Sequence, residues 1–239
     1  MSDPAPRYSI VYLTFNGSGR IAARLEEVLR FLCDGIDKQE VIVHDNGSSD
    51  DTRFSLPDFD AKFEARQTTF RRIHTPTNMG FPRGFNKAIA TARGQFLCLL
   101  SDDVVMTGPG LIEELDARFG AQPDALVGQR VIDWEAGWNQ FGSNPPIAYL
   151  DGYFLACAAE TWNRLGGFDE RYEPYDFEDL DISMKARSLG IPVIADPSLP
   201  LAHLGAQTIG QGNRRYDNTV RQRARFAEKW ALPNAPERP

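Results

Sequence analysis

The feature that most constrains the fold of this chain is the alternation of short apolar runs with stretches of helical periodicity. Residues 20–32 and 80–93 place apolar side chains at helical spacing. Four segments between and around them are expected to be strands: residues 8–15, 40–44, 70–74 and 96–100. The first of them, residues 8–15, has the apolar composition of a strand buried on both faces. Strands that alternate with helices predict an α/β fold, with a mainly parallel sheet and right-handed crossovers.

The second half of the chain has a more mixed pattern and no low-complexity linker separates it from the first. We expect helices over residues 111–119, 180–189 and 218–230, and strands over 125–132 and 148–158. The change of pattern near residue 104 indicates two subdomains that share one sheet. Residues 1–239 are therefore expected to form a single domain.

Net charge, apolar runs and cysteine content weigh against several classes of protein. The 239 residues carry a net charge of −7, and a protein that binds nucleic acid by neutralising phosphates normally has a basic surplus. No apolar run approaches the roughly 18–20 residues of a membrane span. The chain begins without a secretory signal, and its three cysteines lie far apart in apolar surroundings. These features favour a cytoplasmic protein in a reducing compartment, with no nucleic-acid partner.

Polar side chains follow three of the expected strands, and in open α/β sheets ligands bind at this edge. The residues concerned are Thr14, Asn16, Asp45, Asn46, Asp102 and Asp103. Each group taken alone is also ordinary turn chemistry. Asp103, with Asp102 beside it, offers the oxygen ligands that Mg²⁺ or Mn²⁺ prefers. The sequence contains neither a Walker loop nor a GxGxxG fingerprint, which weighs against kinases and dinucleotide enzymes.

Further candidates lie in four segments, each with a functional and a structural interpretation. Residues 78–87 are a glycine-rich entry into a helix that suits a phosphate or is simply a capped helix. The acidic residues 176–181 offer a general base or only favour a helix N-terminus. His203 is a metal ligand or a structural histidine. Trp134 and Trp138 lie in a loop, residues 133–147, that either shapes an acceptor site or packs on the surface.

Six segments in order resemble the family 2 glycosyltransferases of GT-A fold, over about residues 8–205. They read TFN, HDNGSSDDT, NMGFPRGFNKAI, LLSDDV, GGFDERY…FEDLD and HLG. The likeness is greatest to the branch of rhamnosyl- and galactofuranosyl-type transferases. It implies a Rossmann-like, mainly parallel sheet with helices on both faces. A nucleotide-binding half would span about residues 7–104, and a mixed, acceptor-binding half about residues 105–232.

The resemblance also implies roles for individual residues. Thr14 and Asn16 would line the pocket for base and ribose, and Asp45 would accept a hydrogen bond from the base. The remaining nucleotide-side residues would be Asn78, Gly80, Arg83 and Asp102.

On the reacting side, the resemblance assigns a metal site to Asp103 and His203. Ser101 stands where the family's Asp-X-Asp motif has its first acid. Gly152 would lie at the donor-sugar and acceptor strand. Glu178 and Asp179 match the family's acidic pair, with Asp179 as the candidate base. Trp134 and Trp138 are added as candidate acceptor contacts because aromatic faces suit sugar rings.

The implied reaction is an inverting, metal-dependent transfer from a UDP- or dTDP-sugar to a hydroxyl group. The acceptor would be a saccharide, free or lipid-linked, in cell-surface polysaccharide assembly. Asp179 would remove the hydroxyl proton while Mn²⁺ or Mg²⁺ holds the diphosphate. The basic helix at 218–230 allows at most peripheral contact with the inner face of a membrane. Two alternatives stay open: a nucleotidyltransferase with the same kind of metal site, and a non-catalytic sugar-binding relative.

Overall fold

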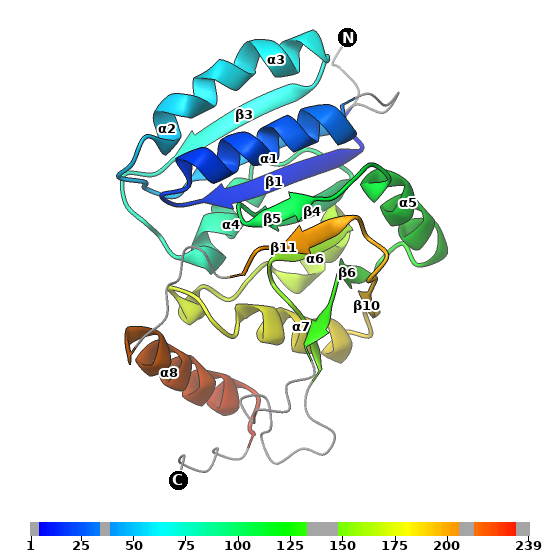
Figure 1. Ribbon diagram of the computed structural model, residues 1–239. Helices are drawn as coiled ribbons and strands as arrows, with labels where there is room; N and C mark the ends of the chain where they lie inside the picture. The colour runs from blue at the N-terminus through cyan, green and yellow to red at the C-terminus, as the bar shows by residue number, and fades with distance from the viewer. Residues whose placement is uncertain (1–4, 34–38, 133–147, 206–212, 233–239) are drawn as a thin grey trace.

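A seven-stranded sheet forms the centre of the computed structural model, which describes residues 5–33, 39–132, 148–205 and 213–232 (Figure 1). The strands follow the order β10-β6-β9-β4-β1-β2-β3. The pairs β1–β2, β1–β4, β2–β3 and β6–β10 are parallel, whereas β9 runs antiparallel to β4 and β6. The seven strands are β1 (Tyr8–Thr14), β2 (Gln39–Asp45), β3 (Thr69–His74), β4 (Phe96–Ser101), β6 (Leu126–Gly128), β9 (Phe154–Ala158) and β10 (Val193–Ala195). The expected mainly parallel α/β fold is confirmed.

Helices cover both faces of this sheet. One hydrophobic cluster packs α1 and α5 on one face, and a second packs α4, α6 and α7 on the other (Figure 1). The longer helices are α1 (Ser18–Phe31), α4 (Phe81–Ile89), α5 (Leu111–Ala121), α7 (Glu178–Ser188) and α8 (Asn213–Lys229). The shorter ones are α2 (Thr52–Ser55), α3 (Asp60–Ala65), α6 (Ala159–Leu165) and the 3₁₀ helices η1 (Leu56–Phe59) and η2 (Glu170–Tyr172).

Strand β1 shows why the central runs are apolar throughout. Ile10 and Tyr12 point into one cluster, while Val11 and Leu13 point into the other. Successive side chains of a strand alternate between faces, so a strand covered by helices on both sides buries every residue. This arrangement leaves only the strand ends available to ligands.

Two of the expected strands are divided in the structure. Residues 125–132 form β6 and then β7 (Val131–Ile132), and residues 148–158 form β8 (Tyr149–Leu150) and then β9. β7 and β8 pair with each other outside the central sheet. Polar residues interrupt the apolar pattern at both divisions: Gln129 and Arg130 separate β6 from β7, and Asp151 and Gly152 separate β8 from β9. The turn between β8 and β9 carries Gly152 to the edge of the sheet.

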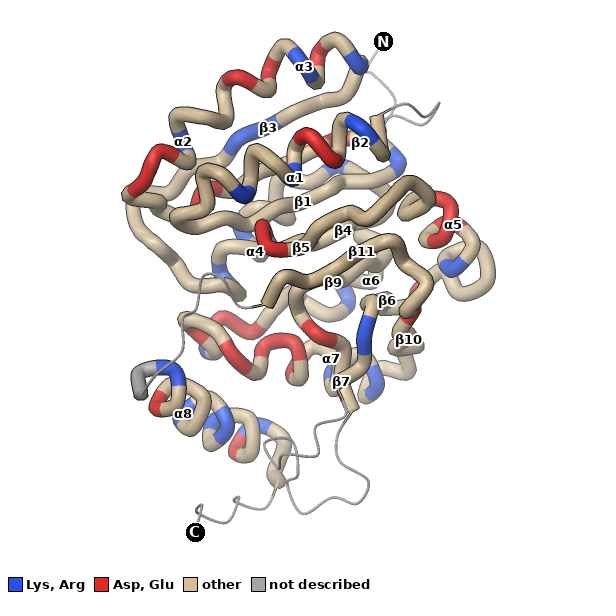
Figure 2. Tube along the Cα trace, in the orientation of Figure 1, with Lys and Arg blue, Asp and Glu red and all other residues tan. Residues whose placement is uncertain are grey.

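Helix α8 begins five residues before the expected helix and packs on α7 through a third cluster. Phe226 and Ala227 are buried there, together with Tyr149, Tyr172, Phe177 and Leu180. Val220 of the same helix is 43% exposed. Figure 2 shows the basic residues of α8 beside the acidic segment that leads into α7. No helix among the described residues has both the length and the apolar character needed to cross a membrane.

Candidate active site

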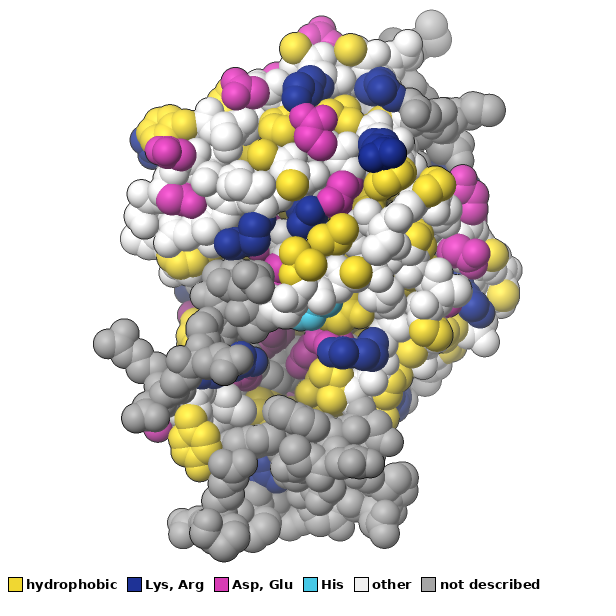
Figure 3. All heavy atoms as spheres, in the orientation of Figure 1, with side chains coloured by type: hydrophobic (Ala, Val, Ile, Leu, Met, Phe, Trp, Pro, Cys, Tyr) yellow, Lys and Arg dark blue, Asp and Glu magenta, His cyan; other side chains and the backbone are white. Residues whose placement is uncertain are grey.

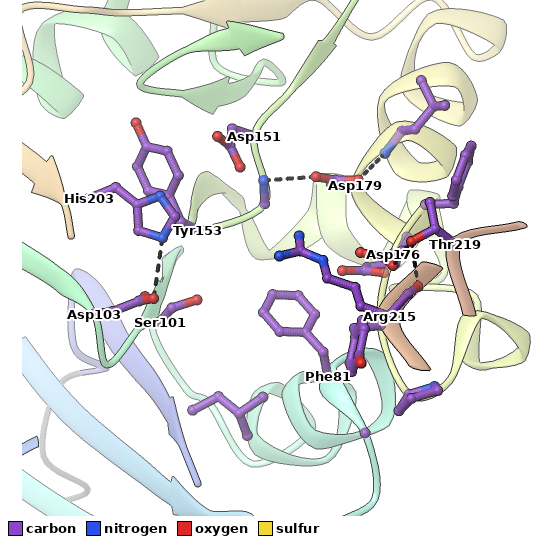
Figure 4. Close-up of a pocket in the computed structure, with 18 of the residues that line it drawn as sticks. Phe81, Ser101, Asp103, Asp151, Tyr153, Asp176, Asp179, His203, Arg215 and Thr219 are labelled. Atoms are coloured by element: carbon purple, nitrogen blue, oxygen red, sulfur yellow. Dashed lines mark hydrogen bonds and ion pairs between the residues drawn. The ribbon is translucent and has the colours of Figure 1, made fainter. Parts of the chain in front are cut away.

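A cleft of about 1140 Å³ opens at the carboxyl ends of β1 and β4. One wall consists of the ends of these strands and of His203, and the opposite wall consists of the turn before β9, the start of α7 and the first turns of α8. In the space-filling view, acidic side chains and a histidine gather in this hollow (Figure 3). Figure 4 shows side chains from both walls pointing into it.

Asp102 lies at the base of the first wall, and its carboxylate contacts Thr14 and Arg20 of the protein itself. The Thr14 hydroxyl donates a hydrogen bond to Asp102 Oδ2 at 2.6 Å, and Arg20 Nη2 lies 3.3 Å from the same oxygen. Burial raises the pKa of Asp102, while the bond from Thr14 and the Arg20 charge oppose that rise. Asp102 therefore ties β1 to β4 at the floor of the cleft.

Asp103 and His203 meet although they are far apart in the sequence. Strand β5 (Val104–Met106) pairs antiparallel with β11 (Leu201–His203), which sets His203 opposite Val104. His203 Nε2 then lies 3.3 Å from Asp103 Oδ2. The imidazole ring also stacks on Tyr153, with 4.4 Å between the ring centroids, and the Tyr153 hydroxyl donates to Gln129. This stacking fixes the plane of the histidine ring.

A carboxylate oxygen and an imidazole nitrogen fit a divalent cation such as Mn²⁺ or Mg²⁺. Asp103 Oδ2 and His203 Nε2 face the same cleft, as Figure 4 shows. Within the part of the chain that the structure describes, no group of three or more His, Cys, Asp or Glu side chains is arranged to hold a metal. A cation bound here would therefore have ligand positions left for a second molecule, such as a diphosphate.

Asp179 projects from the first turn of α7 on the opposite wall. The Gly152 N–H donates to Asp179 Oδ2 at 3.1 Å, and the Leu180 N–H donates to Oδ1 at 2.8 Å. Burial, and then the charge of Asp151, raise the pKa of Asp179 to about 7. A carboxylate with a pKa near neutrality is suited to accept a proton at physiological pH.

Gly152 has to be a glycine for this geometry. A Cβ at position 152 would lie 3.0 Å from Asp179 Cβ and 3.3 Å from Oδ2. The missing side chain thus lets the turn before β9 approach α7 closely enough for the Gly152 N–H to reach the carboxylate.

Glu178 is the buried neighbour of Asp179. It is 6% exposed, and Oε2 has no hydrogen-bond partner among the residues that the structure describes. Burial and the charge of Asp179 raise its pKa well above the ordinary value of a glutamate. The acidic pair thus presents one carboxyl group that favours the protonated form and one that titrates near neutrality.

The residues that precede this pair have an unusual backbone. Asp176 and Phe177 both have φ of 75°, in the left-handed region that residues other than glycine seldom adopt. Such conformations cost on the order of 1–3 kcal/mol each and persist where surrounding contacts enforce them. The Asp176 carboxylate accepts hydrogen bonds from Thr219 and Asn218 of α8.

Most of the residues proposed from the sequence come together in this single cleft. Those that line it are Thr14, Asn78, Gly80, Asp102, Asp103, Gly152, Glu178, Asp179 and His203. Asn78 Oδ1 accepts from the Gly80 N–H, which fixes the glycine-rich entry to α4. Gly80 has φ of +83°, and a Cβ there would lie 3.0 Å from Pro174 O. The roles given to these residues stay predictions.

Three proposed nucleotide-side residues lie outside the lining of the cleft. The Asn16 side chain accepts from Ser49, and the buried Asp45 carboxylate accepts from Ser48 and lies 2.9 Å from His74 Nδ1. The third, Arg83, forms ion pairs with two glutamates, Glu170 at 3.0 Å and Glu173 at 2.7 Å. Trp134 and Trp138 fall outside the described residues.

Several lining residues were not proposed from the sequence. They are Ser101, Arg130, Asp151, Tyr153, Asp176, Arg215 and Thr219, among others. Asp151 stands next to the Gly152 that was selected, and Asp176 stands in the selected acidic run, so both had a local signal. Arg215 and Thr219 belong to α8, whose sequence pattern indicates only an amphipathic helix.

The family model described as "Glycosyl transferase family 2" matches residues 9–179. An N-acetylglucosaminyl-diphospho-decaprenol L-rhamnosyltransferase of Mycobacterium tuberculosis is 25% identical over 72% of this chain and 68% of its own length. This relative is consistent with the rhamnosyl-type branch. Across the curated relatives, the chain spans from 26% to 68% of their length.

Solved structures share the fold. The mannosyltransferase PcManGT of Pyrobaculum calidifontis, in complex with GDP-Man and Mn²⁺, has a TM-score of 0.70 at 18% identity; the match covers 98% of this chain and 66% of that one. GalNAc-T7, with UDP, GalNAc and Mn²⁺, has a TM-score of 0.72 at 14% identity; the match covers 95% of this chain and 48% of that one. The α/β architecture is thus that of the GT-A glycosyltransferases, and the chain belongs to glycosyltransferase family 2.

Proposed function

We propose that this chain transfers a sugar from a nucleoside diphosphate sugar to a hydroxyl group of a saccharide, with inversion of the anomeric configuration and with a divalent cation. The observation that carries this proposal is the composition of one cleft. Asp179, a carboxylate with a pKa of about 7, faces a space whose other wall presents Asp103 and His203. Family membership and the structural neighbours crystallised with Mn²⁺ support the same function.

In the proposed reaction, a single displacement at the anomeric carbon, the cleft residues have separate roles. Asp179 accepts the proton of the acceptor hydroxyl as that oxygen attacks the anomeric carbon, and the nucleoside diphosphate leaves from the opposite face. Attack opposite the leaving group inverts the configuration. Asp103 and His203 would hold Mn²⁺ or Mg²⁺, which supplies positive charge for the departing diphosphate. Fixing both substrates in one cleft contributes a large part of the rate.

We assign the nucleotide to Thr14 and Asp102 on the first wall and to Asn78 and Gly80 at the entry to α4, all of which line the cleft. The base would be read by Asp45, which contacts His74 in this structure. Arg83 would reach the diphosphate only after leaving Glu170 and Glu173. The acceptor would enter along the opposite wall, past Gly152 and Glu178.

The substrate class follows from the rhamnosyltransferase relative, whose name gives an acceptor sugar linked through diphosphate to a polyprenol. We propose a UDP- or dTDP-sugar as donor and a saccharide, free or lipid-linked, as acceptor. Such a step belongs to cell-surface polysaccharide assembly, at the cytoplasmic side of a membrane. The whole of residues 1–239 would act as one catalytic domain, with a nucleotide-binding half and an acceptor-binding half.

The test is a transfer assay with the full chain. UDP-, dTDP- and GDP-sugars are each offered with Mn²⁺, Mg²⁺ or EDTA, together with an N-acetylglucosaminyl-diphospho-lipid acceptor. We expect a metal-dependent product from one donor class, with the opposite anomeric configuration by NMR. Release of pyrophosphate from a nucleoside triphosphate and a sugar phosphate would instead identify a nucleotidyltransferase. Donor binding without transfer to any saccharide would identify a sugar-binding relative.

A further inference from the structure

The face of α8 that packs on residues 171–177 carries polar side chains inside the protein. Asn218 and Gln222 are 4% and 0% exposed. A buried amide costs free energy unless it is fully hydrogen-bonded, so an apolar residue would be the simpler choice for packing alone. Packing alone therefore does not explain why polar side chains occupy these two positions.

These side chains hold the main chain of the segment that precedes α7. Gln222 Nε2 donates to the carbonyl oxygen of Glu173 at 2.5 Å, and Asn218 Nδ2 donates to that of Tyr175 at 2.7 Å. The Arg225 guanidinium donates to the carbonyl oxygen of Arg171. Positions 218, 222 and 225 share one face of a helix, so α8 binds every second residue of this segment.

The same helix face also holds the Asp176 carboxylate. Thr219 Oγ1 donates to Asp176 Oδ2 at 2.7 Å, and Asn218 Nδ2 lies 3.2 Å from that oxygen. Figure 4 shows the bond between Thr219 and Asp176 on the side of the cleft where Asp179 lies. Asp176 is the first of the two residues with left-handed backbone, and the acidic pair follows directly after the second. The contacts from α8 therefore act where the backbone is least favourable by itself.

The segment is fixed from its other side as well. The Phe81 N–H, at the start of α4, donates to the carbonyl oxygen of Pro174 at 2.7 Å. Residues 173–176 are thus bound between α4 and α8, and their main chain has little freedom to shift. Helix α8 lies beyond residue 179, where the family match ends.

We propose that Asn218, Thr219 and Gln222 are positioning residues that hold residues 176–179 so that the Asp179 carboxylate stays aimed at the acceptor hydroxyl. The inference rests on the proposed function, because it takes Asp179 as the base. Gln222 does not line the cleft, so it acts only through the segment that it binds. Thr219 lines the cleft and also holds the carboxylate of Asp176.

Loss of these contacts should change the protonation of Asp179 in one direction. Its pKa is raised first by burial, so water that enters a loosened segment lowers the pKa toward that of a free aspartate. The other titratable and charged groups around Asp179 come from β8, the turns, the start of α7 and α8: Arg130, Tyr149, Asp151, Asp176, Glu178 and Arg215. The substitutions below replace none of these residues; Thr219→Val removes a hydrogen bond from Asp176, whereas Gln222→Leu leaves the contacts of Asp176 in place.

The experiment compares Thr219→Val and Gln222→Leu with the unchanged chain. Two readouts are needed: the titration of the Asp179 side-chain carboxyl by ¹³C NMR in the chain without substrates, and the pH profile of kcat. We expect the Asp179 titration to move to lower pH in both variants. We also expect kcat to fall by roughly tenfold, part of the effect of a positioned general base, with KM for the donor little changed.

Two controls separate positioning from general destabilisation. Thr161 lies in α6, away from the cleft, and its buried hydroxyl donates to the Asp124 carbonyl oxygen, so Thr161→Val should leave the Asp179 titration in place. Thr219→Ser keeps a hydroxyl and should restore both readouts. Should either variant fail to fold by circular dichroism, the other still carries both readouts.

The proposal is overturned when Thr219→Val and Gln222→Leu titrate and react like Thr161→Val. A moved Asp179 titration in a chain that transfers no sugar would support the positioning role and reject the proposed function. The two conclusions are therefore tested separately, since the NMR readout needs no substrate.

Discussion

The two walls of the cleft are built in different ways. Asp102 and Asp103 follow directly from the end of β4, and each is oriented by contacts with neighbouring strands. Asp179 instead follows a strained segment that is held by a helix from the end of the chain. The first wall, with Asp102 and Asp103, is here called the strand wall, and its geometry follows from the strands. The opposite wall, with Glu178 and Asp179, is called the acidic wall, and its geometry depends on packing between distant segments. Substitutions on the acidic wall should therefore impair proton transfer, whereas substitutions on the strand wall should impair metal binding.

The largest expected effect comes from the acidic wall. Asp179→Asn removes the proposed base but keeps the size of the side chain and one acceptor oxygen for the Gly152 N–H. We expect kcat to fall by roughly 10²–10⁴-fold, while the donor Kd measured by calorimetry stays within about twofold. Transfer at the unchanged rate would show that proton removal occurs elsewhere.

On the strand wall, Asp103→Asn should affect metal binding rather than proton transfer. The amide lacks the negative charge that a hard cation favours, so Mn²⁺ affinity in the presence of a nucleoside diphosphate should fall at least about tenfold. Electron paramagnetic resonance of free Mn²⁺ measures this directly. Ser101→Ala, beside it on β4, serves as the control and should retain the metal; equal affinity in Asp103→Asn would move the cation site away from this wall.

A smaller effect is expected where the turn before β9 touches α7. Gly152→Ala places a Cβ against Asp179, so either the turn or the carboxylate has to move by a few tenths of an ångström. We expect kcat to fall by about tenfold with unchanged Mn²⁺ affinity. Gly108→Ala, where a Cβ meets nothing within 4 Å, is the matched control. A loss of metal affinity in Gly152→Ala would show that the two walls are not independent.

The smallest effect concerns stability as a function of pH. The pKa of Asp179 is raised in the folded chain, so folding takes up a proton, and the free energy of unfolding falls as pH rises from about 4 to 7. Asp179→Asn removes the loss of stability that accompanies deprotonation of this carboxyl group. Its Tm should therefore gain more, relative to the unchanged chain, at pH 8 than at pH 5 in calorimetric scans. An equal difference at both pH values would contradict the raised pKa.

Different kinds of sequence signal pointed to the residues of the two walls. Local periodicity predicts buried strands, and polar residues at their ends predict a site at the carboxyl edge. That reasoning located Thr14, Asp102 and Asp103. The acidic residues at positions 178 and 179 were found by their composition and by the family resemblance.

What sequence reasoning missed depends on tertiary contacts. The division of residues 125–132 between two sheets follows from pairing with β8, which no local pattern encodes. The ion pairs of Arg83, a proposed nucleotide-side residue, could not be foreseen, because Glu170 and Glu173 lie far along the chain. The contacts of α8 with residues 171–176 could not be predicted either. An amphipathic pattern indicates that one face of a helix is packed, but it does not identify the segment on which that face packs.

The pairing of β5 with β11 has a consequence for the order in which the chain acquires its site during synthesis. Asp103 and His203 are separated by 100 positions. At about 5–20 residues per second, a ribosome needs roughly 5–20 s to travel from one to the other. Throughout that interval the nascent chain already contains β1 to β4 but lacks one half of the proposed cation site. A cation held by both residues would therefore be captured only after translation has passed β11.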